Sequence, residues 1–218
     1  MNKLAITCNT QNYGGLRAQK VKYIVVHYTA GNGDTARDNG VYFQRNAVGA
    51  SAHWFVDEKD ALLSVPEEFV AWHCGGGVYV HPKCRNANSI GVELCSRKDR
   101  DGVYYFAEDT VENAVELIRE LMKKYEVPPE NVIRHFDVTQ KACPAPFVGA
   151  GHEDWKEFKE MVSMKKYERV EEVPAWGTPT IQKLMAKGIL KGTDTGLDMS
   201  HDMMRTLVIL DRAEVFDK

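Results

Sequence analysis

The run YIVVHYT, residues 23–29, restricts the fold of this chain more than any other feature. It is short, apolar and rich in β-branched residues, which is the pattern of a strand buried on both faces. SIGVELCS, residues 89–96, has the same character, and shorter strand patterns occupy residues 51–57, 61–65 and 131–136. Because strands of this kind lie in the middle of a sheet, helices must cover the sheet on both sides.

Helical patterns separate these strands. The clearest begins near Asp109, where apolar residues recur at helical spacing as far as Tyr125 and Asp109 forms a predicted capping box with Glu112. Residues 35–45 and 152–162 have weaker helical patterns. The alternation predicts an α/β fold in which a mixed central β-sheet is flanked by helices on both faces.

The composition changes near residue 163, where KKYERVEEVPAWG is charged and then marked by a proline. This change predicts a domain of residues 1–163, a linker of residues 164–175 and a small helical module of residues 176–218. In the module, Thr178 and Ser200 are the predicted N-caps of two helices. A helical hairpin of about 45 residues is marginal by itself, so we expect it to pack against the domain or a second copy of the chain.

The charge balance is weak, with 28 Lys and Arg against 31 Asp and Glu. It gives no reason to expect a nucleic acid or a membrane surface as partner, and no apolar run approaches the roughly 20 residues of a membrane span. MNKLAITCNT at the start has no apolar core of the signal-peptide kind. We therefore expect a protein made in the cytoplasm without a signal peptide.

A histidine and a cysteine lie close together in RHFDVTQKACP, where His135 and Cys143 are eight positions apart. His27 and His135 each lie near the end of a predicted buried strand, where functional groups of open α/β sheets gather. Two imidazoles and a thiolate would give three ligands with a fourth position open, as in catalytic zinc sites. The five cysteines are odd in number and irregularly spaced, which argues against a disulfide framework.

Spacing alone leaves two other interpretations open. Cys143 could be the nucleophile of a cysteine peptidase with a histidine as its base, although His27 then has no role. A structural zinc site with four ligands is the other interpretation, and it would use His73, Cys74, His81 and Cys84.

Glu93 and Lys141 are the remaining candidates for chemistry. Strand alternation puts Glu93 on the face opposite Val92, in a run that is otherwise apolar. A carboxylate is costly to bury unless it is paired or functional, so Glu93 is a candidate general base with a raised pKa. The alternative is a glutamate at a strand end that reaches solvent. Lys141, two residues before Cys143, could equally be an ordinary surface lysine.

Four segments in this order resemble the motifs of the type-2 N-acetylmuramoyl-L-alanine amidases: YIVVHYTA, SAHWFVDEKDALLSVPEEFVAWHCGG, NANSIGVELC and IRHFDVTQKACP. That family includes phage endolysins, bacterial autolysins and animal peptidoglycan recognition proteins. The resemblance covers residues 20–150 and implies a sheet flanked by helices, a Zn²⁺ ion in a surface groove and cleavage of bacterial peptidoglycan.

The resemblance also implies roles for particular residues. His27, His135 and Cys143 match the zinc ligands, and Glu93 and Lys141 match catalytic positions of the family. Some members carry a catalytic tyrosine just before the histidine of the second strand.

This chain has Ala52 at the position of that tyrosine, which favours Glu93 as the base. The AWH motif implies that His73 lies at the groove wall, where it would hold the substrate or the oxyanion. Asn88 is a further candidate for substrate binding.

The implied reaction is hydrolysis of the amide between N-acetylmuramic acid and L-alanine, by a phage endolysin that acts on the cell wall after release and causes host lysis. A non-catalytic peptidoglycan-binding module is the rival of the same fold; loss of the cysteine ligand is its usual mark, and Cys143 is present. GILKGTDTGLDMSHDMMRTLVILDRA resembles the terminal modules of some clostridial phage endolysins. We therefore expect residues 176–218 to bind the cell wall or to form a homo-oligomer.

Overall fold

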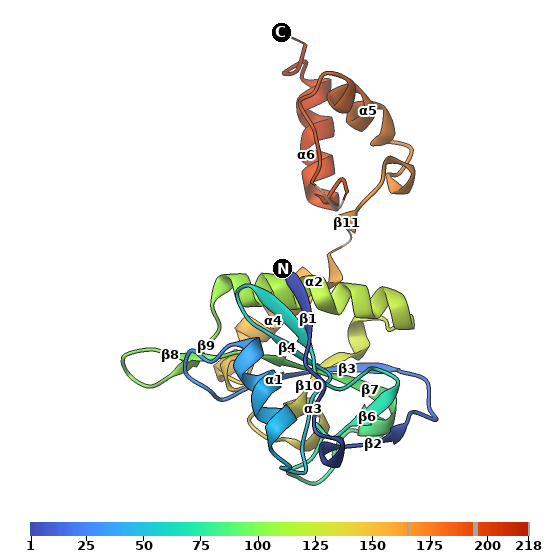
Figure 1. The fold of residues 1–218 in the computed structure, drawn as a ribbon. Helices are drawn as coiled ribbons and strands as arrows, with labels where there is room; N and C mark the ends of the chain where they lie inside the picture. Colours follow the sequence, from blue (N-terminus) through green and yellow to red (C-terminus); the bar gives the residue numbers. More distant parts are fainter. Residues whose placement is uncertain (165, 194–195, 218) are drawn as a thin grey trace. The chain divides into compact units, whose positions relative to one another are not determined.

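The computed structural model describes residues 1–164, 166–193 and 196–217. The chain divides into two compact units, Met1–Val162 and Ser163–Lys218, and Figure 1 shows the elements of each. Across the part of the chain that the structure describes, no helix has the length and apolar character needed to cross a membrane.

A six-stranded sheet forms the centre of the first unit. Its strand order is β1 (Asn2–Ala5), β5 (Asp60–Leu63), β4 (Trp54–Val56), β7 (Ser89–Leu94), β3 (Tyr23–Tyr28) and β10 (Val132–Arg134). Neighbouring strands are parallel except β4 and β5, which are antiparallel, so the sheet is mixed as the sequence predicts. The two apolar runs become β3 and β7, which pair with each other in the middle of the sheet.

Helices cover both faces of this sheet, which confirms the predicted α/β class (Figure 1). The long helix α2 (Glu108–Tyr125) and α4 (Glu153–Ser163) pack on one face, where Ile24, Val26, Ile90 and Val92 belong to the main core. The other face carries α1 (Ala36–Arg45), which packs on β4 and β5, and the short α3 (His135–Thr139), which contacts β3 and β10. His27, Gly91 and Glu93 alternate with core residues and so belong to this second face.

Short elements complete the first unit. Two small antiparallel pairs join β2 (Tyr13–Leu16) to β6 (Phe69–Ala71) and β8 (Arg97–Lys98) to β9 (Tyr104–Tyr105). The 3-10 turns are η1 (Thr10–Asn12), η2 (Asn86–Asn88), η3 (Pro129–Asn131), η4 (Ala145–Phe147) and η5 (Ala150–His152).

The predicted capping box of α2 is wrong. The helix begins at Glu108, one residue earlier than predicted, and its N-cap is Ala107, whose side chain cannot accept a hydrogen bond. Asp109 therefore lies inside the first turn, where its charge is favourable next to the N-terminal end of the helix dipole. A capping box does form at α1, where Thr35 and Asp38 bond reciprocally.

The second unit contains β11 (Lys166–Tyr167), η6 (Val170–Glu172), α5 (Thr178–Ala186), β12 (Met199–Ser200) and α6 (His201–Arg212). It has a small apolar core of its own, formed by Tyr167, Val173, Ile181, Leu197, Met199 and Met204. Ser200 caps α6 as predicted, because its hydroxyl accepts the backbone N–H of Met203 at 3.1 Å.

Two details of this unit differ from the prediction. Thr178 is the first residue of α5 and its hydroxyl donates to the Val173 and Pro174 carbonyls, so Gly177 takes the N-cap position. Residues 164–175, predicted as a linker, contribute buried Tyr167 and Val173 to the core of the second unit. The charged, proline-containing segment therefore belongs to the second unit and is not a linker.

Candidate metal centre

Three side chains meet at the end of β3: His27, His135 and Cys143. All three are buried, and one ligand atom from each lies within 4.8 Å of the others. The rings of His27 and His135 have centroids 4.7 Å apart, and Cys143 Sγ is 3.7 Å from His27 Nδ1. The sequence prediction that these residues come together agrees with this geometry.

Local backbone structure brings His135 and Cys143 together. The predicted strand of residues 131–136 ends at Arg134, and His135 begins α3, because the Asp137 carboxylate accepts the Arg134 backbone N–H at 2.8 Å and so caps a helix there. After α3 the chain turns back, and the Phe136 N–H donates to the Cys143 carbonyl at 2.7 Å. The eight-residue spacing in sequence thus becomes a direct approach of two ligand side chains.

Burial sets the protonation of the cluster. Desolvation, followed by the neighbouring histidines, holds the pKa of His27 well below its usual value, and desolvation lowers the pKa of His135 to about 4. Desolvation also raises the pKa of Cys143 to about 12, with the charge of Glu93 adding to it and the Tyr28 backbone hydrogen bond opposing it. Neutral imidazoles are ready to bind a metal, whereas the thiol must first lose its proton.

These properties fit a metal ligand better than a nucleophile. A reactive cysteine is partly exposed and has a lowered pKa, but Cys143 is buried and its pKa is raised. Burial and a raised pKa therefore argue against Cys143 as the nucleophile of a cysteine peptidase.

The donor set fits Zn²⁺. His135 Nε2 is buried with no hydrogen-bond partner, while hydrogen bonds to the backbone of Gly75 and Cys74 engage the same ring. A buried nitrogen without a partner is costly unless a ligand satisfies it. Two imidazoles and a thiolate with a fourth position open is a donor set of catalytic zinc sites.

The alternative structural zinc site does not form. His81 Nδ1 accepts the backbone N–H groups of Lys83 and Cys84, and Cys74 and Cys84 pack with Tyr23 in an apolar cluster. Within residues 1–164, 166–193 and 196–217, the His27–His135–Cys143 group is the one set that brings three such ligand atoms together.

Glu93 and Lys141 lie beside the cluster. Glu93 is the register partner of His27 on the adjacent strand. Its side chain is partly exposed, yet Oε2 is buried without a partner. Desolvation raises the pKa of Glu93 to about 8, and the charge of Lys141 acts in the opposite direction. Lys141 itself is exposed, and its charge also lowers the pKa values of His27 and His135.

His73 and Asn88, the two predicted substrate contacts, have hydrogen-bond partners inside the protein. His73 is buried, and its two nitrogens face His27 Nε2 at 3.0 Å and Ser89 Oγ at 3.1 Å. Asn88 is also buried; its Nδ2 donates to the Lys83 carbonyl and its Oδ1 accepts the Arg85 N–H. The polar atoms of both side chains are thus engaged inside the protein, and their binding of substrate stays a prediction.

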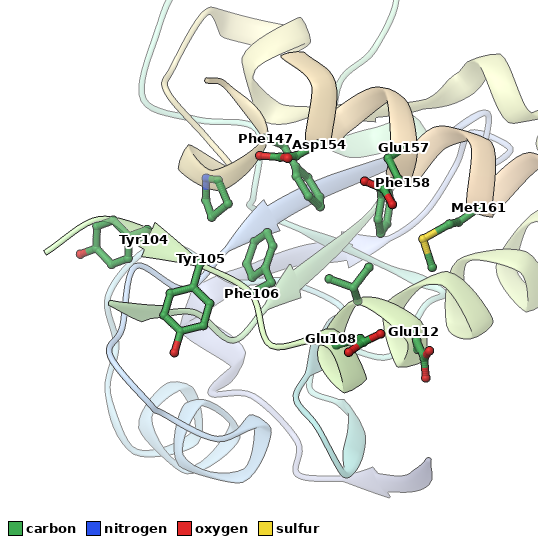
Figure 2. Close-up of a pocket in the computed structure, with 12 residues that line it drawn as sticks. Tyr104, Tyr105, Phe106, Glu108, Glu112, Phe147, Asp154, Glu157, Phe158 and Met161 are labelled. Carbon is green, nitrogen blue, oxygen red and sulfur yellow. The ribbon is translucent and has the colours of Figure 1, made fainter. Parts of the chain in front are cut away.

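A separate hollow of the first unit lies between β9, the start of α2, η4 and α4, with a volume of about 430 Å³. Figure 2 shows Phe106, Phe147 and Phe158 in its interior and the acidic side chains of Glu108, Glu112, Asp154 and Glu157 around it. None of the three cluster residues lines it, so it is distinct from the candidate metal centre.

A model of the N-acetylmuramoyl-L-alanine amidase family, Amidase_2, matches residues 17–146, which is more than half of the chain and includes the whole cluster. The chain belongs to this amidase family. The family named by the resemblance of the motifs is therefore confirmed.

N-acetylmuramoyl-L-alanine amidases of Bacillus are similar to this chain over about two thirds of its length or more. The N-acetylmuramoyl-L-alanine amidase CwlL of Bacillus licheniformis is 40% identical over 152 residues, which is 66% of this chain and 41% of that protein. BlyA of Bacillus subtilis is 38% identical over 173 residues, 73% of this chain and 46% of that protein. The chain thus spans less than half the length of these amidases.

Solved structures give the same family. A mutant endolysin from Bacillus subtilis is 28% identical with a TM-score of 0.62, covering 74% of this chain and 99% of that one. The PlyG catalytic domain is 32% identical with a TM-score of 0.60, covering 74% of this chain and 93% of that one. The clostridial origin of the C-terminal module remains a prediction.

Proposed function

We propose that the chain is a zinc-dependent amidase that hydrolyses the amide between N-acetylmuramic acid and L-alanine in bacterial peptidoglycan. The observation that supports this most directly is the buried His27–His135–Cys143 cluster, in a chain of the amidase family. Retention of Cys143 argues against a non-catalytic binding module of the same fold.

Zn²⁺ held by these three residues would act as a Lewis acid on the amide carbonyl and would lower the pKa of water in the site. The chain's own residues supply the proton transfers. Glu93, which lies on the strand next to His27, takes the proton from the attacking water and delivers it to the leaving amine of L-alanine. A raised pKa suits both steps, because the same group must accept and then release a proton.

Lys141 stabilises the negative charge that develops on the carbonyl oxygen. Its side chain lies next to the glycine-rich segment of residues 75–77, since a Cβ at Gly76 would be 3.7 Å from Lys141 Nζ. A donor in this role is typically worth about 3–4 kcal/mol. Some family members have a catalytic tyrosine where this chain has the buried Ala52. Without that tyrosine, Glu93 and Lys141 are the proposed catalytic residues.

The proposed biological setting is a phage endolysin that is released from the host cytoplasm and lyses the wall. Support comes from the endolysin whose structure resembles this chain over most of its length. Peptidoglycan is the proposed partner.

Digestion of purified cell wall tests the activity. New N-terminal alanine should appear without new reducing sugar. A zinc chelator should stop the release, because removal of the metal removes the Lewis acid from the site. Alanine release that is unchanged in a chelator, with no metal bound, would exclude the zinc mechanism; release of reducing sugar would exclude the amidase reaction.

The second unit is proposed to hold the enzyme on the wall or to join two copies of the chain. From residue 165 onward the chain has nine basic and nine acidic residues, so bulk charge does not explain attachment. Apolar side chains are exposed instead, among them Trp176, Ile189 and Ile209. An exposed apolar surface of this kind is typical of an interaction site.

A chain that ends at Ser163 should keep its activity on small soluble muropeptides and lose most of its activity on intact walls. The expectation follows because each unit has its own apolar core. Rates on both substrates and the thermal unfolding midpoint are the measurements. Joint loss of both activities and of thermal stability would mean that residues 164–218 complete the fold of the first unit and do not tether it.

A further inference from the structure

We propose that Ser89 and His73 are positioning residues that hold His27 in the tautomer whose Nδ1 is free to bind the metal. The proposal rests on the zinc site proposed above. It gives a role to His73, whose two ring nitrogens face partners inside the protein, and to Ser89, which the sequence does not single out.

The hydrogen-bond chain begins at a backbone carbonyl. The Ser89 hydroxyl donates to the carbonyl of Arg85 at 2.8 Å. A carbonyl can only accept, so the single hydroxyl proton of Ser89 is used there. Ser89 Oγ is also 3.1 Å from His73 Nε2. This second contact is a hydrogen bond only when His73 Nε2 carries the proton and donates it to Ser89.

The same reasoning extends to His27. A neutral imidazole has one N–H, so a proton on His73 Nε2 leaves His73 Nδ1 as an acceptor. His73 Nδ1 is 3.0 Å from His27 Nε2, and His27 Nε2–H therefore donates to it. The lone pair of His27 is then on Nδ1, the nitrogen that faces Cys143 Sγ at 3.7 Å. The opposite direction of the chain would put a proton on Nδ1, where it would block the metal.

Strand β7 is built to admit this arrangement. Ser89, Gly91 and Glu93 alternate along it and share one face. A Cβ on Gly91 would lie 2.6 Å from His73 Cγ, so the ring of His73 rests directly on this glycine. The rings of His73 and His27 stand nearly perpendicular, at 89°. Cys74 Sγ also lies 3.3 Å from His73 Nδ1.

One strand therefore serves the site in two ways. Glu93 lies beside His27 as the proposed base, and Ser89, four residues earlier, sets the orientation of the ligand through His73. Hydrogen bonds to a ligating histidine commonly change metal affinity by about 10-fold to 100-fold when they are removed.

The test compares two buried serines, one at the start of β7 and one two residues beyond its end. Ser89 and Ser96 are both 0% exposed, and each donates its hydroxyl to a backbone carbonyl, at 2.8 Å to Arg85 and 2.9 Å to Gly31. Ser89→Ala and Ser96→Ala thus remove the same atom at equal burial, but only Ser89 touches His73. Zinc dissociation constants of the full chain are measured by competition with a chelator, together with the unfolding midpoints of the metal-free proteins.

We expect Ser89→Ala to bind zinc about 10-fold to 100-fold more weakly than the wild type, and Ser96→Ala to stay within about 2-fold. Equal affinities in the two variants would overturn the positioning role while leaving the zinc site intact. A wild-type chain that binds no zinc would instead overturn the zinc site, and this proposal with it.

The tautomers give a second readout that does not depend on zinc affinity. Nitrogen-15 NMR of the metal-free protein should find the proton on Nε2 in both His73 and His27, and Ser89→Ala should give a mixture at His73. A proton on Nδ1 of His73 in the wild type would overturn the proposed direction of the chain.

Discussion

Cys143→Ser should release most of the bound zinc and remove most of the wall-lytic activity. A serine hydroxyl is neutral at pH 7, so the substitution replaces an anionic thiolate ligand with a weak neutral donor. The two histidines would remain, but two imidazoles without the thiolate leave the ion with too few protein ligands for a stable catalytic site. Zinc per protein by atomic spectroscopy and the rate of wall clearing are the measurements.

A matched cysteine controls for the cost of a polar atom in the core. Cys95 is as buried as Cys143, since both are 4% exposed, and desolvation raises the pKa of Cys95 too. It is not part of the metal cluster. Cys95→Ser should therefore keep its zinc and lose at most some thermal stability. Full activity of a metal-free Cys143→Ser protein would remove the zinc assignment altogether.

The centre of the fold is predictable from sequence because its signals are local and strong. Continuous β-branched runs mark β3 and β7 as strands buried on both faces, and the alternation along β7 separates Val92, in the main core, from Glu93, beside the metal cluster. The grouping of His27, His135 and Cys143 is predictable too, although only through the order of the motifs. Spacing alone leaves a peptidase and a structural zinc site open.

The details that sequence misses depend on contacts between distant residues. The resemblance of the AWH motif implies that His73 lies at a groove wall, but it does not show that the ring packs against Gly91, eighteen residues further along. Asn88 bonds to its own loop rather than facing a groove. Ser89 gives no sequence signal, since a serine at the start of a strand is unremarkable until its two partners, Arg85 and His73, are known.

Boundaries are the other weak point of sequence reasoning. Charge and a proline suggest a linker at residues 164–175, whereas Tyr167 and Val173 are buried there in a core that includes Met204, far along the chain. Two apolar side chains in a polar segment are easily overlooked, because the pattern they complete lies in α5, α6 and β12.

Glu93 is the residue whose chemistry can be isolated most cleanly. Its Oε2 is buried with no hydrogen-bond partner, and desolvation raises its pKa to about 8. A carboxylate held in this state is unfavourable for stability, so the fold gains nothing from its charge. Glutamine has nearly the same shape but cannot take a proton from water. Glu93→Gln thus changes the proposed proton transfer while leaving the cluster ligands in place.

We expect Glu93→Gln to bind zinc as the wild type does, to unfold at the same or a higher temperature, and to hydrolyse walls about 10²-fold to 10⁴-fold more slowly. The control is Glu67→Gln. Glu67 is also buried, but it is paired, with Lys124, Tyr125 and Trp54 as partners, so this change should lower stability with little effect on turnover. Opposite outcomes for the two variants separate catalysis from folding. A zinc-loaded Glu93→Gln enzyme that works at the normal rate would show that another group takes the proton. Lys141, the other proposed catalytic residue, would be the next residue to replace.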